Sequence, residues 1–183
     1  SIAATSGGGV TVGGTASALT LSGTITDINA FIAGSNVAYV TAADANGSVT
    51  LTVLTSDQGN SGSGGTLTDS DTVSLNITAV NDAPVLSNGS NLAYTENQTA
   101  TAINTAITIG EVDNTTLALA TVHITGNYQS AEDVLGFTNS GGMGNISGVW
   151  NSGSGTLALS SAGATATVAE WQTALRAVTY ANT

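Results

Sequence analysis

The sequence predicts an all-β protein, and three observations support this. Hydrophobic residues make up 41% of the chain and charged residues only 7%, and much of the remainder is Thr, Ser, Gly and Asn. β-branched residues favour strands, while Gly, Asn and Ser favour turns. Several segments alternate apolar and polar residues, most clearly over 49–54 and 71–79, as half-buried strands do. Glycine-rich turns separate these segments.

The alternation predicts strands in both halves of the chain. In the first half they are expected near residues 10–12, 19–21, 37–40, 49–54 and 71–79. In the second half they are expected near residues 93–94, 106–109, 117–125, 134–137, 148–150, 156–159 and 177–180. Each half also has one predicted helix, starting at Thr24 or Thr167, where an acidic residue follows three positions later. Residues 56–65 form a loop rich in Gly and Ser.

A junction between two β-domains is predicted around Pro84, the single proline in the chain. Proline has no backbone N–H to donate, so we expect one sheet to end there. Asn81 and Asp82 precede it and place side-chain oxygens at a strand end. We therefore divide the chain into residues 1–82, a junction at 83–91, and residues 92–183.

An internal repeat links the two halves. Leu19–Ser22 matches Leu157–Ser160, and Val37–Tyr39 matches Val178–Tyr180, at separations of about 140 residues. The two helix starts match in the same way. Residues 1–82 are then the later part of one repeat, and residues 92–183 the earlier part of the next. The chain starts at Ser1 without Met, so we expect a window of a longer polypeptide or a processed form. Neighbouring repeats or separate copies would complete each half.

The charge balance excludes several classes of partner. The net charge is −11 with a single Arg, which disfavours nucleic acid and anionic membranes. Unpaired carboxylates instead favour divalent cations. The chain has no Cys, which excludes disulfides, and no apolar run reaches the roughly 18 residues of a membrane span. With one His, His123, and no nucleophile motif, we expect no enzymatic activity.

Several motifs resemble cadherin-like, Ig-like tandem repeats of giant bacterial surface proteins of the RTX-adhesin and biofilm type. The closing strand and junction of such repeats are matched by Asp57–Asn60, Thr68–Thr72 and Asn76–Val85. Their opening strand and acidic turn are matched by Tyr94–Asn97 and Gly110–Asp113. The resemblance implies tandem β-sandwich repeats, each here with one short helix, exported to the cell surface.

The same resemblance implies Ca²⁺ bound where repeats meet, because Ca²⁺ prefers six to eight oxygen ligands. By motif position, the implied ligands are Asn81, Asp82, Glu96, Glu111 and Asp113. The family usually has Asp at the position of Glu111, and its linkers carry more carboxylates, so we expect one ion or a weak site. The alternative is that these acids are solvated loop caps, with Asn81 and Asp82 in an Asx turn. A second cation candidate comprises Asp57, Asp69 and Asp71.

These expectations point to a non-enzymatic structural module of a long extracellular protein or filament, with localisation at the cell surface. It would form a cation-rigidified rod for adhesion or biofilm, with neighbouring copies or repeats of itself as partners. Head-to-tail strand complementation is one mode of assembly. The alternative is a glycan- or ice-binding module, with surface glycans as partners. That alternative depends on Thr-x-Thr pairs at residues 24/26, 50/52, 66/68 and 165/167.

Overall fold

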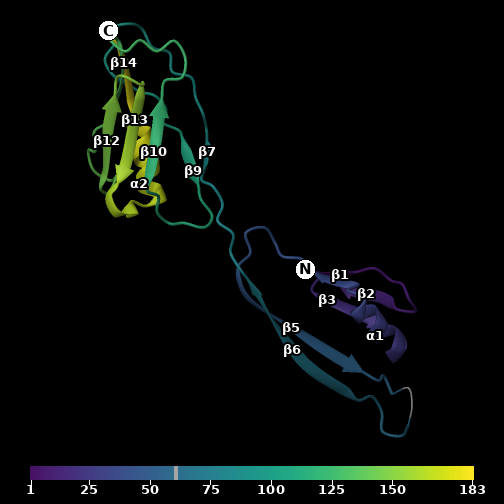
Figure 1. Ribbon diagram of the computed structural model, residues 1–183. Helices are drawn as coiled ribbons and strands as arrows, with labels where there is room; N and C mark the ends of the chain where they lie inside the picture. The colour runs from purple at the N-terminus through teal and green to yellow at the C-terminus, as the bar shows by residue number, and fades with distance from the viewer. Residues whose placement is uncertain (60–61) are drawn as a thin grey trace. The chain divides into compact units, whose positions relative to one another are not determined.

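The protein is built mostly of strands, with two short α-helices in the part of the chain that the structure describes (Figure 1). The computed structural model describes residues 1–59 and 62–183. The predicted loop at 56–65 therefore lies partly outside the described residues. The chain forms two compact units, unit 1 (Ser1–Val80) and unit 2 (Asn81–Thr183), which are described separately.

The elements of each unit follow the chain in order. Unit 1 contains β1 (Ile2–Ala4), β2 (Thr11–Thr15), β3 (Ala18–Ser22), α1 (Ile25–Ala33), β4 (Val37–Tyr39), β5 (Gly47–Ser56) and β6 (Thr68–Ile77). Unit 2 contains β7 (Val85–Ser87), β8 (Thr101–Ala102), β9 (Thr108–Gly110), β10 (Leu119–His123), β11 (Asp133–Gly136), β12 (Ile146–Asn151), β13 (Thr156–Ser161), a 3₁₀ turn (Ala162–Ala164), α2 (Val168–Arg176) and β14 (Thr179–Asn182).

The structure differs from the predicted elements at several points. Strands β1 and β8 were not predicted, because each is short and shows no clear alternation. Residues 93–94, predicted as a strand, are irregular. Residues 85–87 fall inside the predicted junction at 83–91 but form β7, which pairs with β9. Unit 2 begins at Asn81, just before the predicted junction.

Unit 2 contains two three-stranded antiparallel sheets and one two-stranded sheet. Their strand orders are β10-β13-β12, β11-β14-β8 and β7-β9. Inward-facing residues of β13 alternate with outward-facing ones, so that Leu157 and Leu159 are buried and Ala158 is exposed. This alternation directs one face of the sheet towards the core.

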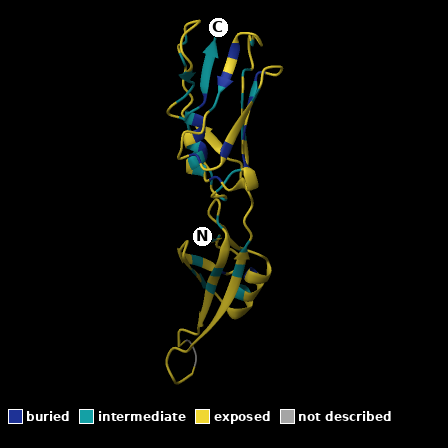
Figure 2. Cartoon of the chain, turned by 90° about the vertical axis from the view of Figure 1, so that its left-hand side faces the viewer, coloured by how far each residue is buried: buried dark blue, intermediate teal, exposed yellow. Residues whose placement is uncertain are grey.

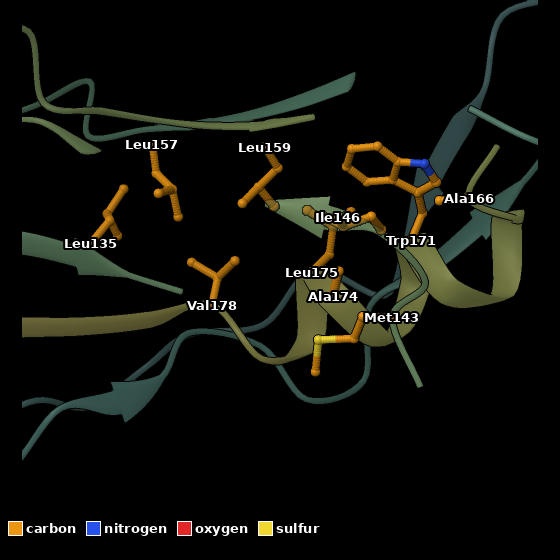
Figure 3. Close-up of a cluster of buried hydrophobic side chains, with 10 residues drawn as sticks. All are labelled: Leu135, Met143, Ile146, Leu157, Leu159, Ala166, Trp171, Ala174, Leu175 and Val178. Atoms are coloured by element: carbon orange, nitrogen blue, oxygen red, sulfur yellow. The ribbon is translucent and has the colours of Figure 1, made fainter. Parts of the chain in front are cut away.

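One hydrophobic core joins both three-stranded sheets to α2 (Figure 3). Its buried members are Leu135, Met143, Ile146, Leu157, Leu159, Ala166, Trp171, Ala174, Leu175 and Val178. Helix α2 presents Trp171, Ala174 and Leu175, which have the i, i+3, i+4 spacing of one helix face. The Trp171 side chain is 0% exposed, and its Nε1 donates to the Leu117 carbonyl at 2.8 Å.

Unit 1 is much less buried than unit 2 (Figure 2). Its described strands form three separate two-stranded sheets, β1-β4, β2-β3 and β5-β6. Among its described hydrophobic residues, Val10 and Phe31 are the buried ones. Two-stranded sheets have little stability of their own in water, so this unit depends on what covers its exposed apolar residues.

The internal repeat appears in the structure as a shared order of elements and strand pairs. In unit 1, β1 pairs with β4 and β2 with β3; in unit 2, β11 pairs with β14 and β12 with β13. The tyrosine in the last strand of each set also has an equivalent cross-strand neighbour: Tyr39 lies opposite Ile2, and Tyr180 lies opposite Leu135. Each nine-residue helix lies between the third and fourth of these strands, and a Thr caps its N-terminus.

Candidate functional site at the start of unit 2

Strand pairing between β7 and β9 places two polar segments beside each other. The pairing is antiparallel, with Val85 opposite Gly110. Residues before Val85 therefore run alongside residues after Gly110. This brings residues 81–84 close to residues 111–114, which together include four of the five predicted ligands.

Hydrogen bonds connect the two segments directly. The Asp82 N–H donates to Asp113 Oδ2 at 2.6 Å, and Asn114 Nδ2 donates to Asn81 Oδ1 at 3.0 Å. Asn81 Nδ2 in turn donates to the Asp82 carbonyl at 3.1 Å. The site thus consists of two chain segments joined by hydrogen bonds, in which amide N–H groups already donate to several oxygens.

Glu111 organises the acidic turn around one of its two oxygens. Its Oε1 accepts from the Asp113 N–H at 3.0 Å and the Asn114 N–H at 3.1 Å. These donors stabilise the charged form, so they lower the pKa of Glu111, and the Asp113 amide contributes most. The other oxygen, Oε2, is buried and has no hydrogen-bond partner among the described residues. A buried carboxylate oxygen without a partner is costly, so Oε2 is the one oxygen here with an unmet need for a donor or cation.

Glu96 lies apart from this group. It is exposed and lies beside a groove that is also lined by Asp133 and Asn182, and the neighbouring Asn97 N–H donates to the Asn182 carbonyl. The physical reason is topological: Glu96 is in the long connection between β7 and β8, which reaches the end of β14. The structure therefore brings together Asn81, Asp82, Glu111 and Asp113, and leaves out Glu96.

The donor set at the start of unit 2 fits a hard cation in chemical type, because it consists of oxygens and includes the orphaned Glu111 Oε2. Its present geometry is looser than that of a preformed metal centre. Within residues 1–59 and 62–183, no group of three or more His, Cys, Asp or Glu side chains is arranged to hold a metal ion. Amide oxygens, backbone carbonyls or water would have to supply most of the ligands.

In the second cation candidate (Asp57, Asp69 and Asp71), Asp57 holds a loop closed through backbone hydrogen bonds. Asp57 Oδ1 accepts from the Gly59 N–H at 2.9 Å and the Leu67 N–H at 2.8 Å, so it closes the base of the β5–β6 loop. These bonds lower the pKa of Asp57, with the Gly59 amide as the largest cause. Asp69 and Asp71 lie in β6, opposite Thr55 and Val53. Asn60 and Ser61 of the same predicted loop lie outside the described residues.

The Thr-x-Thr pairs lie in different structural contexts. Thr24 and Thr167 are helix N-caps, in unit 1 and unit 2 respectively. Thr50 and Thr52 lie in β5, where they face Ser74 and Thr72. The helix caps and the strand residues are therefore in different kinds of element, and the glycan- or ice-binding alternative stays a prediction.

A buried acid, Asp133, lies at the other end of unit 2; the sequence places it in the pair Glu132-Asp133 just before a predicted strand, where we expect an exposed loop acid rather than a buried one. Asp133 accepts from the Tyr180 hydroxyl at 2.5 Å, from Asn182 Nδ2 at 2.9 Å and from the Gln129 N–H at 2.7 Å. The Tyr180 bond is the largest cause of the lowered pKa of Asp133, and it raises the pKa of Tyr180 to about 12. The sequence signal that could have indicated its burial is spacing: Asp133 lies two residues before the buried Leu135, and residues two apart in a strand lie on the same face.

Comparisons with protein-family models, with curated proteins and with solved structures found no match for this chain. In the described part of the chain, no helix is both long enough and apolar enough to cross a membrane. We therefore infer function from the internal repeat and from the chemistry of the sites described above.

Proposed function

We propose that the chain is a non-enzymatic structural module of a long extracellular surface protein or filament, built from tandem Ig-like, cadherin-like sandwich repeats. The observation that carries the proposal is the internal repeat. The strand pairs and capped helix of unit 1 recur in unit 2 in the same order. Such recurrence is typical of proteins whose length comes from stacking one unit many times.

The low-charge, acidic composition supports an extracellular mechanical role. The chain carries twelve acidic residues against one basic residue, so carboxylate repulsion opposes compaction unless cations neutralise it. The start of unit 2 lies where one repeat gives way to the next. A cation held there would hold residues 81–82 to residues 111–113 and fix the path of the chain into the unit.

The residues that would hold Ca²⁺ are Asn81, Asp82, Glu111 and Asp113, with Glu111 Oε2 as the oxygen that gains most. Bound Ca²⁺ would supply positive charge to an oxygen that has no donor. Because such an ion binds the folded state, it raises stability by mass action, by about 2.7 kcal/mol at a concentration one hundred times its Kd.

A calcium titration tests the proposal. The thermal melting of the 183-residue chain is measured in Ca²⁺ and in EGTA, with Trp fluorescence reporting on unit 2, which contains Trp150 and Trp171. We expect Ca²⁺ to raise the melting temperature of unit 2 in the wild type. The Asp113→Asn and Glu111→Gln variants should lose most of this rise.

The matched control is Glu96→Gln, which also removes one carboxylate from unit 2 but lies away from the site. This variant should keep the full response to Ca²⁺. Equal melting in Ca²⁺ and EGTA for the wild type would rule out cation stiffening. A loss of response in the Glu96→Gln variant as large as in Asp113→Asn would show that the cation binds elsewhere.

A further inference from the structure

Unit 2 has a groove of about 600 Å³ at the end where Asp133 lies. Part of its lining is apolar: Val122 and Ile124 come from the β10 region, and Leu135 comes from β11. Val122 and Ile124 are half-buried and pack against the core, so this part of the groove is a margin of the core that solvent can reach. Small-molecule sites usually have volumes of about 300–1,000 Å³ and combine apolar walls with a few polar groups. The groove has the size and the lining of such a site.

Two acidic residues from distant parts of the chain line the same groove. Glu96 belongs to the connection between β7 and β8 and is exposed, while Asp133 starts β11 and is 5% exposed. Tyr94 and Tyr180 also line the groove, and their ring centroids lie 4.9 Å apart in an edge-to-face arrangement. Carboxylates and the faces of aromatic rings both attract cations. The polar part of the groove therefore favours a positively charged group.

Asp133 carries a buried charge that only neutral groups stabilise. Its three hydrogen-bond donors are the Tyr180 hydroxyl, the Asn182 side-chain amide and the Gln129 N–H. A carboxylate can accept about four hydrogen bonds, so capacity for one more donor remains. A buried charge is costly without an opposite charge nearby, and a cation bound beside it reduces that cost.

These 183 residues do not supply such a cation themselves. Their single basic side chain is Arg176 in α2, which does not line the groove. Its guanidinium Nε donates to the Ile107 carbonyl at 2.8 Å. A second copy of the same residues offers the same single guanidinium group. The cation that fits the groove therefore comes from a different molecule.

We propose that the groove binds an alkylammonium group, with the ammonium beside Glu96 and Asp133 and the alkyl chain on the apolar part of the lining. A free amine and a lysine side chain of a partner protein both present this chemistry. Anionic ligands are disfavoured, because two carboxylates and no Lys or Arg side chain line the groove. This binding activity goes beyond the proposed structural role and does not depend on Ca²⁺ at the start of unit 2.

A nuclear magnetic resonance titration of the isotope-labelled 183-residue chain tests the proposal. It is run at pH 7.5, where an ordinary imidazole is mostly neutral, because His123 also lines the groove. Hexylammonium should shift the signals of groove residues such as Asn182, and it should bind at least roughly tenfold more tightly than hexanol or hexanoate. Each buried CH₂ group contributes a factor of about four, so hexylammonium should also bind several-fold more tightly than butylammonium.

Two matched variants, Glu96→Gln and Glu132→Gln, each remove one carboxylate from an exposed glutamate of unit 2. Glu96 lines the groove, whereas Glu132 does not. Glu96→Gln should weaken hexylammonium binding at least roughly fivefold because it removes a charge beside the ammonium, and Glu132→Gln should weaken it less than about twofold. Both side chains are exposed, so both variants should fold, which thermal melting checks.

A separate arm of the titration distinguishes the two sources of the ammonium group. Nα-acetyl-lysine methylamide carries its ammonium on the same length of alkyl chain as butylammonium. Binding as tight as that of butylammonium assigns the groove to a lysine of a partner protein, and clearly weaker binding assigns it to a free amine.

Equal affinities for hexylammonium, hexanol and hexanoate would overturn the proposal, and so would equal losses in the two variants. Signal shifts confined to residues 81–114 would also overturn it, because the ammonium would then occupy the cation site proposed there. The same samples are melted in Ca²⁺ and EGTA to separate the two proposals. A chain that responds to Ca²⁺ but binds no alkylammonium refutes this inference alone.

Discussion

Replacing Trp171 with Ala should remove the largest single contribution to the core of unit 2. The indole is 0% exposed and belongs to the core that joins α2 to both three-stranded sheets. Truncating a buried Trp to Ala costs about 3–5 kcal/mol. The change also leaves the Leu117 carbonyl without its 2.8 Å donor, which costs about 1–3 kcal/mol if no water replaces it. These effects overlap, so we expect a loss of about 4 kcal/mol.

Urea unfolding measures this loss, with Trp150 fluorescence and circular dichroism as probes. Trp150 is the remaining tryptophan and lies in β12 of the same unit. The free energy of unfolding of a domain is about 5–15 kcal/mol, so this variant should unfold at a much lower urea concentration or fail to fold. Trp171→Phe keeps an aromatic ring but loses the Nε1 donor, so its free energy of unfolding should lie between those of the wild type and Trp171→Ala.

The internal repeat supplies the matched control. Ile28 occupies in α1 the position that Trp171 occupies in α2, and it is only half-buried. Ile28→Ala should therefore cost about 1 kcal/mol, in unit 1 alone. A loss below about 1.5 kcal/mol for Trp171→Ala, or equal losses for the two variants, would contradict the view that one unit has a packed core and the other does not.

Three further predictions concern caps and buried charge. Thr167→Ala should destabilise unit 2 by about 1 kcal/mol in urea unfolding, with Thr167→Ser nearly neutral, because the Thr167 hydroxyl accepts the Glu170 N–H. The pKa of Asp133 is lowered in the folded state, so its stabilisation is present above about pH 4 and is lost as the pH falls further. The pKa of Tyr180 is raised to about 12, so its stabilisation of the fold is present below about pH 10 and is lost as the pH rises towards 12. Asp133→Asn should abolish the acid-side and the alkaline-side losses, measured by pH-dependent melting and by tyrosinate absorbance.

The sequence predicted the elements whose signals are local. Both helices begin at the expected threonines, because a capping side chain three residues before an acid is a signal contained within four residues. The helical spacing of apolar residues after each threonine predicts core positions for Phe31 and Trp171, and both are buried, whereas Ile25 and Ile32, at the same spacing in α1, are exposed. The long alternation over 49–54 and 71–79 also predicted a pair of strands; β5 extends two residues beyond the prediction at each end, while β6 starts three residues earlier and ends two residues earlier than predicted.

Features that depend on strand pairing could not be read from the sequence. Strand β8 has two residues, and it is a strand because Thr101 and Ala102 pair with β14. The separation of Glu96 from Glu111 follows from the path of the chain between β7 and β9, which motif spacing does not report. The buried position of Asp133 likewise depends on its register opposite Asn182.

The contrast between the two units has a single physical origin. Strand β13 has neighbours on both edges, β10 and β12, while its counterpart β3 pairs with β2 alone in the described chain. Likewise β14 lies between β11 and β8, while β4 pairs with β1 alone. Each missing neighbour removes one row of inward-facing side chains, so Tyr39 is 38% exposed where Tyr180 is half-buried. Both copies of the repeat form the same helix and strand pairs, but a large core forms in the unit that also contains β8 and β10. Supplying equivalents of these two strands to unit 1 should therefore bury Tyr39.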